Sequence, residues 1–265
     1  MIPRKLLFHG YRFQRCCLIL LLPACFFLFF ACSHSPATSS PTALSDEQYQ
    51  EMAAAFAARD YARLRRELIQ LKNEGIKDKR ALYLEALMNL NNPENAKPLL
   101  LEALRLDPQY SEAHNTLGVI YVQEKQYPLA ETEFVKAVSN PLYATPEKAY
   151  QNLGNLYREQ GKDELALACY RKALKYNLDY FPAHYELARY YFRQKELRAA
   201  LKEINQAREL SPKHPGVWLL IGEIEELRDN PGPAREAYKK VLELQPVGVF
   251  ADQARQKLKE LPPAD

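Results

Sequence analysis

The chain has 265 residues, 47% of them apolar and 26% charged, which is ordinary for a folded protein of one large domain or two smaller ones. Only nine glycines among many Ala, Leu, Glu and Lys residues favour helices over a β-sandwich, because straight-chain residues lose little rotamer freedom in a helix. Four of the 36 Lys and Arg residues lie in the acid-free residues 1–31, so the remainder carries 32 basic against 33 acidic residues and lacks the basic excess that a nucleic-acid partner requires.

Residues 1–31 have the pattern of an export signal peptide. Residues 1–15 are basic, residues 16–31 carry no charge, and the chain then turns polar. The apolar run of 16 residues is short for a membrane-spanning helix, which needs roughly 20. An uncleaved membrane anchor is the alternative interpretation.

The sequence FFAC at residues 29–32 resembles the box of bacterial lipoprotein signals, in which the cysteine becomes the lipidated first residue of the mature chain. That family prefers leucine where Phe29 stands. A second match, LPAC at residues 22–25, fits less well because cleavage there would leave an apolar segment on the mature protein. The resemblance therefore implies a lipid on Cys32, and Ser33 after it implies the periplasmic face of the outer membrane.

Residues 32–44 are rich in Ser, Pro and Thr, have no apolar period and are predicted to form a flexible tether from the lipidated cysteine. From residue 45 to residue 248, one pattern recurs with a period near 34. Apolar residues spaced at i, i+3 and i+7 within each unit predict amphipathic helices. The six predicted units are residues 45–76, 77–110, 111–146, 147–180, 181–214 and 215–248.

Small and aromatic residues stand at fixed offsets within these units. The small residues are expected to let the two helices of a unit approach closely, and the aromatic residues to fill the space between units. The small positions are Gly118, Gly154, Ala188 and Gly222 in the first helices, and Ala130, Ala166, Ala200 and Ala234 in the second helices.

These offsets resemble the tetratricopeptide repeat (TPR) signature, W-x2-L-G-x2-Y followed by A-x3-F and P. The resemblance implies an all-α TPR superhelix of about six helix-turn-helix units, because a single unit cannot bury its own apolar face. Residues 249–265 are predicted to be a capping helix and tail, with Phe250, Ala254 and Leu258 on one apolar stripe.

In a TPR stack the first helix of each unit lines the concave face, and the resemblance maps that lining onto nine residues. Arg and Tyr are favoured anchors at protein interfaces, so we expect the part in the unit at 181–214 to dock a partner segment. An ordinary solvated helix face is the alternative. The chaperone-binding clamp of this family is not expected, because Gln151 stands where it has Lys. The nine residues are Asn115, Val119, Gln151, Asn155, Arg158, Tyr185, Arg189, Phe192 and Arg193.

The loop at residues 139–146 is two residues longer than the period requires and contains Leu142 and Tyr143, two candidates for an exposed binding site. The alternative is that both tuck under the next helix. The segment NPLYxTP at residues 140–146 resembles a repeat junction of the type IV pilus biogenesis lipoproteins (the PilF/PilW type, or pilotins). This resemblance implies binding to a secretin subunit in the periplasm and help with its outer-membrane assembly.

Two other functions stay open. One is a general TPR adaptor that recruits envelope proteins such as peptidoglycan hydrolases. The other is a protein held by an uncleaved N-terminal helix, with its repeats in the cytoplasm.

The sequence predicts no enzyme, cofactor, metal site or small-molecule substrate. It contains no HExxH, GxSxG, P-loop or CxxC motif. His114 and His184 occupy the position that Trp218 has in its unit, so packing explains them. Cys169, the one cysteine after residue 32, is expected to be a small packing residue.

Overall fold

The computed structural model describes residues 43–262, so the predicted signal peptide, Cys32 and most of the tether lie outside the described residues. The chain divides into two units, Met1–Ser39 and Ser40–Asp265, and every helix described below belongs to the second. The helices are α1 (Asp46–Ala57), α2 (Tyr61–Asn73), α3 (Lys79–Met88), α4 (Pro93–Leu106), α5 (Ser111–Gln123), α6 (Tyr127–Ser139), α7 (Pro146–Glu159), α8 (Asp163–Tyr176), α9 (Phe181–Arg193), α10 (Leu197–Leu210), α11 (Pro215–Leu227), α12 (Pro231–Leu244) and α13 (Val249–Glu260).

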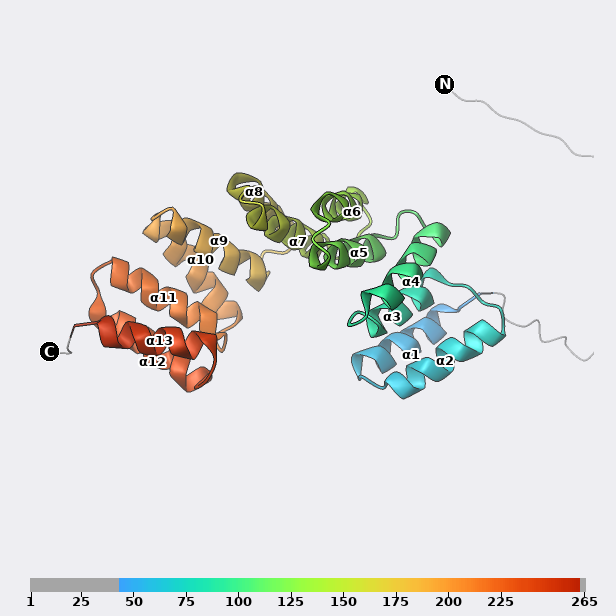
Figure 1. The fold of residues 1–265 in the computed structure, drawn as a ribbon, viewed down its shortest axis with the longest axis horizontal. Helices are drawn as coiled ribbons and strands as arrows, with labels where there is room; N and C mark the ends of the chain where they lie inside the picture. The colour runs from blue at the N-terminus through green and yellow to red at the C-terminus, as the bar shows by residue number, and fades with distance from the viewer. Residues whose placement is uncertain (1–42, 263–265) are drawn as a thin grey trace, which may run out of the picture. The chain divides into compact units, whose positions relative to one another are not determined.

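The helices form six consecutive pairs, α1–α2 to α11–α12, which follow one another in chain order, with α13 packed on the last pair (Figure 1). The two helices of a pair pack on each other, and from α4 onward the second helix also packs on the first helix of the next pair. The predicted fold class, an all-α TPR stack of about six pairs and a capping helix, is confirmed. Residues 43–262 contain no strand, and none of their helices has the length and apolar character to cross a bilayer.

The beginning of the first pair corrects the predicted end of the tether. Leu44 is buried in the same apolar cluster as Met52, and its carbonyl accepts a hydrogen bond of 2.9 Å from Arg80 Nη2. The next residue, Ser45, caps α1 in a capping box with Gln48. The tether prediction was therefore wrong for Leu44, because an apolar residue just before a helix cap packs back onto the helix.

Glycines in the first helices bring the two helices of a pair into contact. A Cβ atom on each glycine would collide with a ring from the second helix of the same pair, which confirms the close approach expected from the small residues. Each ring fills the space left by the missing side chain, and Phe134 and Tyr238 also belong to buried clusters that extend into the following helix. The added Cβ atom would lie 2.6 Å from the Phe134 ring at Gly118, 2.5 Å from the Tyr170 ring at Gly154, and 2.3 Å from the Tyr238 ring at Gly222.

The last helix covers the end of the sixth pair. Ala251 and Ala254 of α13 are buried, and Phe250 and Leu258 pack against the cluster that contains Tyr238 of α12. The predicted apolar stripe is thus confirmed.

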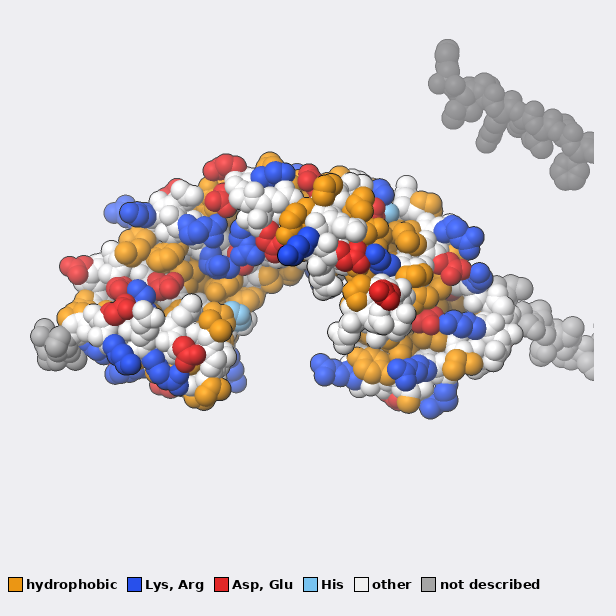
Figure 2. Space-filling view, in the orientation of Figure 1, with side chains coloured by type: hydrophobic (Ala, Val, Ile, Leu, Met, Phe, Trp, Pro, Cys, Tyr) orange, Lys and Arg blue, Asp and Glu red, His pale blue; other side chains and the backbone are white. Residues whose placement is uncertain are grey.

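Charged side chains of both signs are interspersed across the face of this unit that Figure 2 shows. Many of them pair, as Lys97 does with Glu124 at 2.8 Å and Lys72 with Glu85 at 2.6 Å. Because an exposed pair stabilises by at most about 1 kcal/mol, the stack depends mainly on its buried apolar clusters.

Candidate functional site

The predicted groove residues of α5 and α7 form a hydrogen-bonded polar network. Asn152 Nδ2 donates to Asn115 Oδ1 at 2.9 Å, which links α7 to α5. Within α7, Gln151 Nε2 donates to Asn155 Oδ1 at 3.2 Å, and the same oxygen accepts a bond of 3.0 Å from the Tyr170 hydroxyl of α8. Of the nine predicted residues, Gln151 and Asn155 therefore hold each other, and Asn115 is held by Asn152, which is not one of the nine.

The arginines of α7 and α9 share one carboxylate. Glu186, whose side chain is only 12% exposed, accepts a bond of 3.2 Å from Arg158 and one of 3.1 Å from Arg189. The Arg158 Nε and the Gln151 Oε1 are buried without a hydrogen-bond partner in the described part of the chain. One carboxylate is therefore shared by two guanidinium groups.

Of the four α9 residues expected to act as one strip, two line a cavity. Tyr185 and Arg189 line the same cavity. Phe192 instead packs against the buried cluster of α9, α10 and α11, and Arg193 extends to Asp163 of α8 at 3.5 Å. Val119 likewise packs against a buried cluster, that of α7 and α8. Phe192 and Arg193 do not line this cavity, so the docking strip of all four residues stays a prediction.

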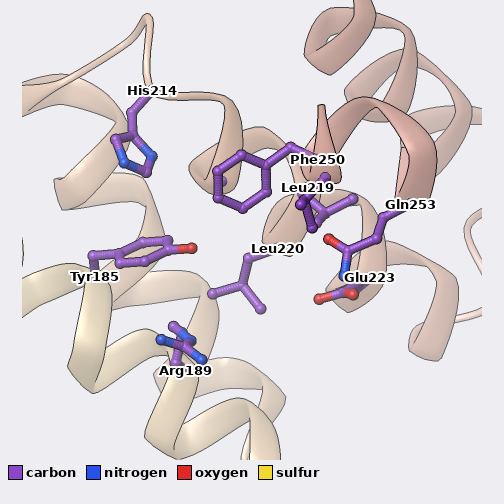
Figure 3. A pocket seen from close by; sticks show the side chains of 10 residues that line it. Tyr185, Arg189, His214, Leu219, Leu220, Glu223, Phe250 and Gln253 are labelled. Atoms are coloured by element: carbon purple, nitrogen blue, oxygen red, sulfur yellow. The ribbon is translucent and has the colours of Figure 1, made fainter. Parts of the chain in front are cut away.

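The cavity has a volume of about 460 Å³ and lies between α9, α11 and α13 (Figure 3). Its walls are aromatic and aliphatic, with charged groups at separate places: Arg189 below Tyr185, and Glu223 beside Gln253. The cavity is lined by Tyr185, Arg189, His214, Gly216, Leu219, Leu220, Glu223, Val249, Phe250 and Gln253.

Aromatic side chains from three elements meet at one end of this cavity. The His214 ring lies 5.3 Å from the Tyr185 ring and 6.3 Å from the Phe250 ring, between centroids. Gly216 makes room for them, because a Cβ there would lie 2.6 Å from the Tyr185 hydroxyl and 3.2 Å from Phe250 Cζ. At these separations the rings contact one another and form one aromatic wall of the cavity.

Burial shifts the pKa values of His214 and Glu223 in opposite directions. It lowers the pKa of His214 below its ordinary value, so the ring is neutral at pH 7, and its Nδ1 has no hydrogen-bond partner among the described residues. Burial also raises the pKa of the Glu223 carboxyl; Glu226 raises it further, whereas Lys257 and Arg189 lower it. The cavity therefore combines a neutral imidazole with a desolvated carboxyl group.

Sequence reasoning missed His214, Glu223 and Gln253 as members of a site and assigned Phe250 only to the cap. A signal was nevertheless present in the period of 34, because Glu223 stands one period after Arg189, and Leu219 one period after Tyr185. Equivalent positions of successive first helices lie next to each other in a stack of repeats. No comparable signal brings Phe250 and Gln253 to the cavity, since α13 lies outside the repeats.

The two loop candidates have opposite environments. Tyr143 is 7% exposed and packs with Ala137 and Ala149, as the alternative interpretation expected, whereas Leu142 is 88% exposed. Asn140 shapes the turn by accepting a 3.0 Å bond from the Leu142 N–H. A second cavity, of about 440 Å³, is lined by both residues together with Tyr49, Lys79, Arg80, Asp107, Gln109, Tyr110, Ser111, Glu112 and Asn140.

The histidines at the tryptophan position are buried and hydrogen-bonded. His184 Nε2 donates to the Leu178 carbonyl at 2.8 Å, just as Trp218 Nε1 donates to the Pro212 carbonyl at 2.7 Å. His184 Nδ1 lies 2.7 Å from Glu203, and this hydrogen bond raises the pKa of His184 despite the opposing effect of burial. His114 makes the corresponding contacts, so packing accounts for both rings.

Cys169 has a packing environment. It is buried, its thiol is free, and burial raises its pKa to about 11, so it is a poor thiolate nucleophile at neutral pH. Between residues 43 and 262, no group of three or more His, Cys, Asp and Glu side chains is placed to hold a metal ion.

Comparison with known proteins identifies the repeats. The family model described as tetratricopeptide repeat matches residues 84–144 and 185–248, and a second model described as TPR repeat matches residues 154–195. The chain is 25% identical to the anaphase-promoting complex subunit CDC16 of Saccharomyces cerevisiae over 139 residues, which are 51% of this chain but only 16% of that protein.

Two solved structures share the fold over most of their length. Pseudomonas aeruginosa PilF superposes with a TM-score of 0.72 at 17% identity, over 80% of this chain and 96% of that one. PilW, described as a widely conserved type IV pilus biogenesis factor, has a TM-score of 0.66 at 22% identity, over 80% of this chain and 95% of that one. At these identities the similarity establishes a common fold.

Proposed function

Because the chain belongs to the tetratricopeptide-repeat family, whose members bind other proteins, we propose that it is a protein-binding scaffold of the type IV pilus secretin pathway. In this role it is a pilotin-like factor that binds a secretin subunit and assists its localisation and assembly in the outer membrane. It needs no cofactor, and it carries out no reaction, as is typical of TPR scaffolds.

One observation carries the proposal. The six pairs correspond to nearly the whole length of both PilF and PilW, whereas the chain matches only a small part of the larger TPR protein CDC16. The NPLYxTP segment at residues 140–146 supports it, since its Leu142 is exposed and therefore accessible to a partner.

The proposed location rests on the sequence before the helices. An export signal at residues 1–31 followed by a lipid on Cys32 would anchor the chain to the periplasmic face of the outer membrane. Several acyl chains are needed for firm anchoring, because one chain alone binds a membrane only reversibly. Attachment by an uncleaved N-terminal helix is the competing arrangement, and mass spectrometry of the N-terminus distinguishes the two.

A general adaptor that recruits envelope proteins such as peptidoglycan hydrolases is the second candidate. Two observations favour it. Residues 84–144 and 154–248 match general tetratricopeptide-repeat models, and part of the chain also resembles CDC16, a subunit of an unrelated assembly.

The deciding experiment is a secretin assembly assay in a deletion strain of the source organism. Heat-stable secretin multimers are detected by immunoblotting after the inner and outer membranes have been separated. We expect multimers to be lost or misplaced, and to be restored by the wild-type gene but not by Cys32→Ala. Normal multimers in the outer membrane of the deletion strain would contradict the pilotin role and leave the general adaptor.

A further inference from the structure

The cavity between α9, α11 and α13 contains a carboxylate that no cation of the described chain neutralises. Glu223 forms no ion pair within residues 43–262. The two nearest cations already have partners: Arg189 bonds Glu186 at 3.1 Å, and Lys257 bonds Glu226 at 3.2 Å. Glu223 is therefore the acidic group of this cavity that has no ion-pair partner among the described residues.

The surroundings of Glu223 suit a ligand group that is long, apolar along its stem and positive at its end. Leu219, Leu220 and Phe250 provide aliphatic and aromatic surface beside it, and Gln253 lies next to its carboxylate (Figure 3). Aromatic faces attract cations, and a carboxylate removed from water binds a cation more strongly than an exposed one does. Because His214 is neutral, it adds no positive charge to oppose such a ligand.

We propose that this cavity binds a lysine or arginine side chain of the partner protein, with its aliphatic stem against Leu220 and Phe250 and its cationic end at Glu223. The inference rests on the proposed protein-binding function and specifies the chemistry of one of its contacts. An acidic partner segment would need Arg189 instead, whose Nη1 already bonds Glu186. The site is thus selective for basic partner segments through charge complementarity.

The test uses the purified full chain and four synthetic nine-residue Gly/Ser peptides with a central Leu-X-Leu. X is lysine, arginine, glutamate or norleucine, which is the uncharged analogue of lysine. Binding is followed through the His214 ring resonances in two-dimensional NMR. We expect the lysine and arginine peptides to bind about tenfold more tightly than the other two, as a close charge pair in a dry site implies.

Two variants make the result specific. Glu223→Gln preserves the shape of the side chain and is expected to remove the preference for basic peptides. Glu236→Gln, at an exposed position of α12 whose side chain is 72% exposed, is expected to retain it.

Equal binding of the lysine and norleucine peptides, tighter binding of the glutamate peptide, or no effect of any peptide on His214 would overturn the proposal. The assay contains neither secretin nor membrane. A negative peptide result together with lost or misplaced multimers in the deletion strain would therefore reject the pocket but not the pilotin role. A preference for basic peptides together with normal multimers in the deletion strain would reject the pilotin role alone.

Discussion

The Tyr170 ring of α8 lies against Gly154 of α7, where a Cβ atom would come within 2.5 Å of the ring atom Cε1. The ring is fully buried, and its hydroxyl donates to Asn155 Oδ1 at 3.0 Å, so it has little freedom to move aside. This contact fixes the spacing of the fourth helix pair.

Gly154→Ala should therefore destabilise the protein, by about 1–3 kcal/mol, as overpacking of a buried contact does. The measurement is the free energy of unfolding in urea, followed by far-UV circular dichroism. Gly232→Ala is the matched control, since a Cβ there meets nothing within 4 Å and the substitution should be neutral or stabilise by up to about 1 kcal/mol. Equal losses in both variants would contradict the close-packing explanation.

The turns between paired helices place single residues in the left-handed region. Lys195 has φ 59°, a conformation that costs an L-residue about 1–2 kcal/mol, whereas Gly161 has φ 70° at the corresponding turn of the preceding pair. Lys195→Gly should raise the thermal unfolding midpoint by a few degrees, and Gly161→Ala should lower it. A lower midpoint for Lys195→Gly would show that the lost side chain, or the added chain entropy of glycine, outweighs the relief of strain.

The His184–Glu203 contact should make stability depend on pH. The pKa of His184 is raised in the folded chain, so its contribution is fully present below the unfolded pKa of about 6.5 and is lost as pH rises through the folded value. The difference in unfolding free energy between the wild type and Glu203→Gln should therefore be largest near pH 6, at about 1.5–3 kcal/mol, and fall towards pH 9. A difference that stays constant with pH would mean that the imidazole is not protonated in the fold.

Tyr185 lines the cavity and Arg193 does not, so substitutions at these two residues should affect partner binding unequally. Tyr185→Ala removes a wall of the cavity and should weaken binding to the purified periplasmic domain of the secretin by at least about tenfold. Arg193→Glu, outside the cavity, should change affinity less than about threefold, as is usual for exposed charges. Calorimetric titration gives the affinities, and the helical circular dichroism signal checks folding. A larger effect of Arg193→Glu would place the contact on the α8 side of the stack.

Leu142 and Tyr143 should respond differently to substitution. Tyr143→Ala should lower the free energy of unfolding by about 3 kcal/mol, since the ring is buried between α6 and α7. Leu142→Ser should leave stability unchanged within about 0.5 kcal/mol, because the side chain is exposed. If the loop contacts the secretin, Leu142→Ser should nevertheless reduce secretin multimers in cells, and full assembly with this variant would remove the loop from the proposed interface.

The repeat pattern by itself determined the fold class and the positions of close approach. Each helix pair buries the same face against equivalent neighbours, so one local period specifies which side chains become buried. The spacing of Gly154 and Ala166 therefore predicted a tight helix pair, and the stripe with Ala254 predicted the capping helix. The burial of Leu44 was not predicted, because this residue precedes the first repeat and its burial depends on a helix cap.

The tertiary structure alone decided the composition of the candidate site. The pair of Glu186 with Arg189 is local to α9, but only the distance between α7 and α9 shows that Glu186 also holds Arg158. The cavity is assembled from α9, α11 and α13, which belong to different repeats or to none. A repeat period indicates which face of a helix is buried. The surroundings of a charged side chain depend instead on distances between helices. Glu223 could therefore be recognised as a site residue only in the folded chain.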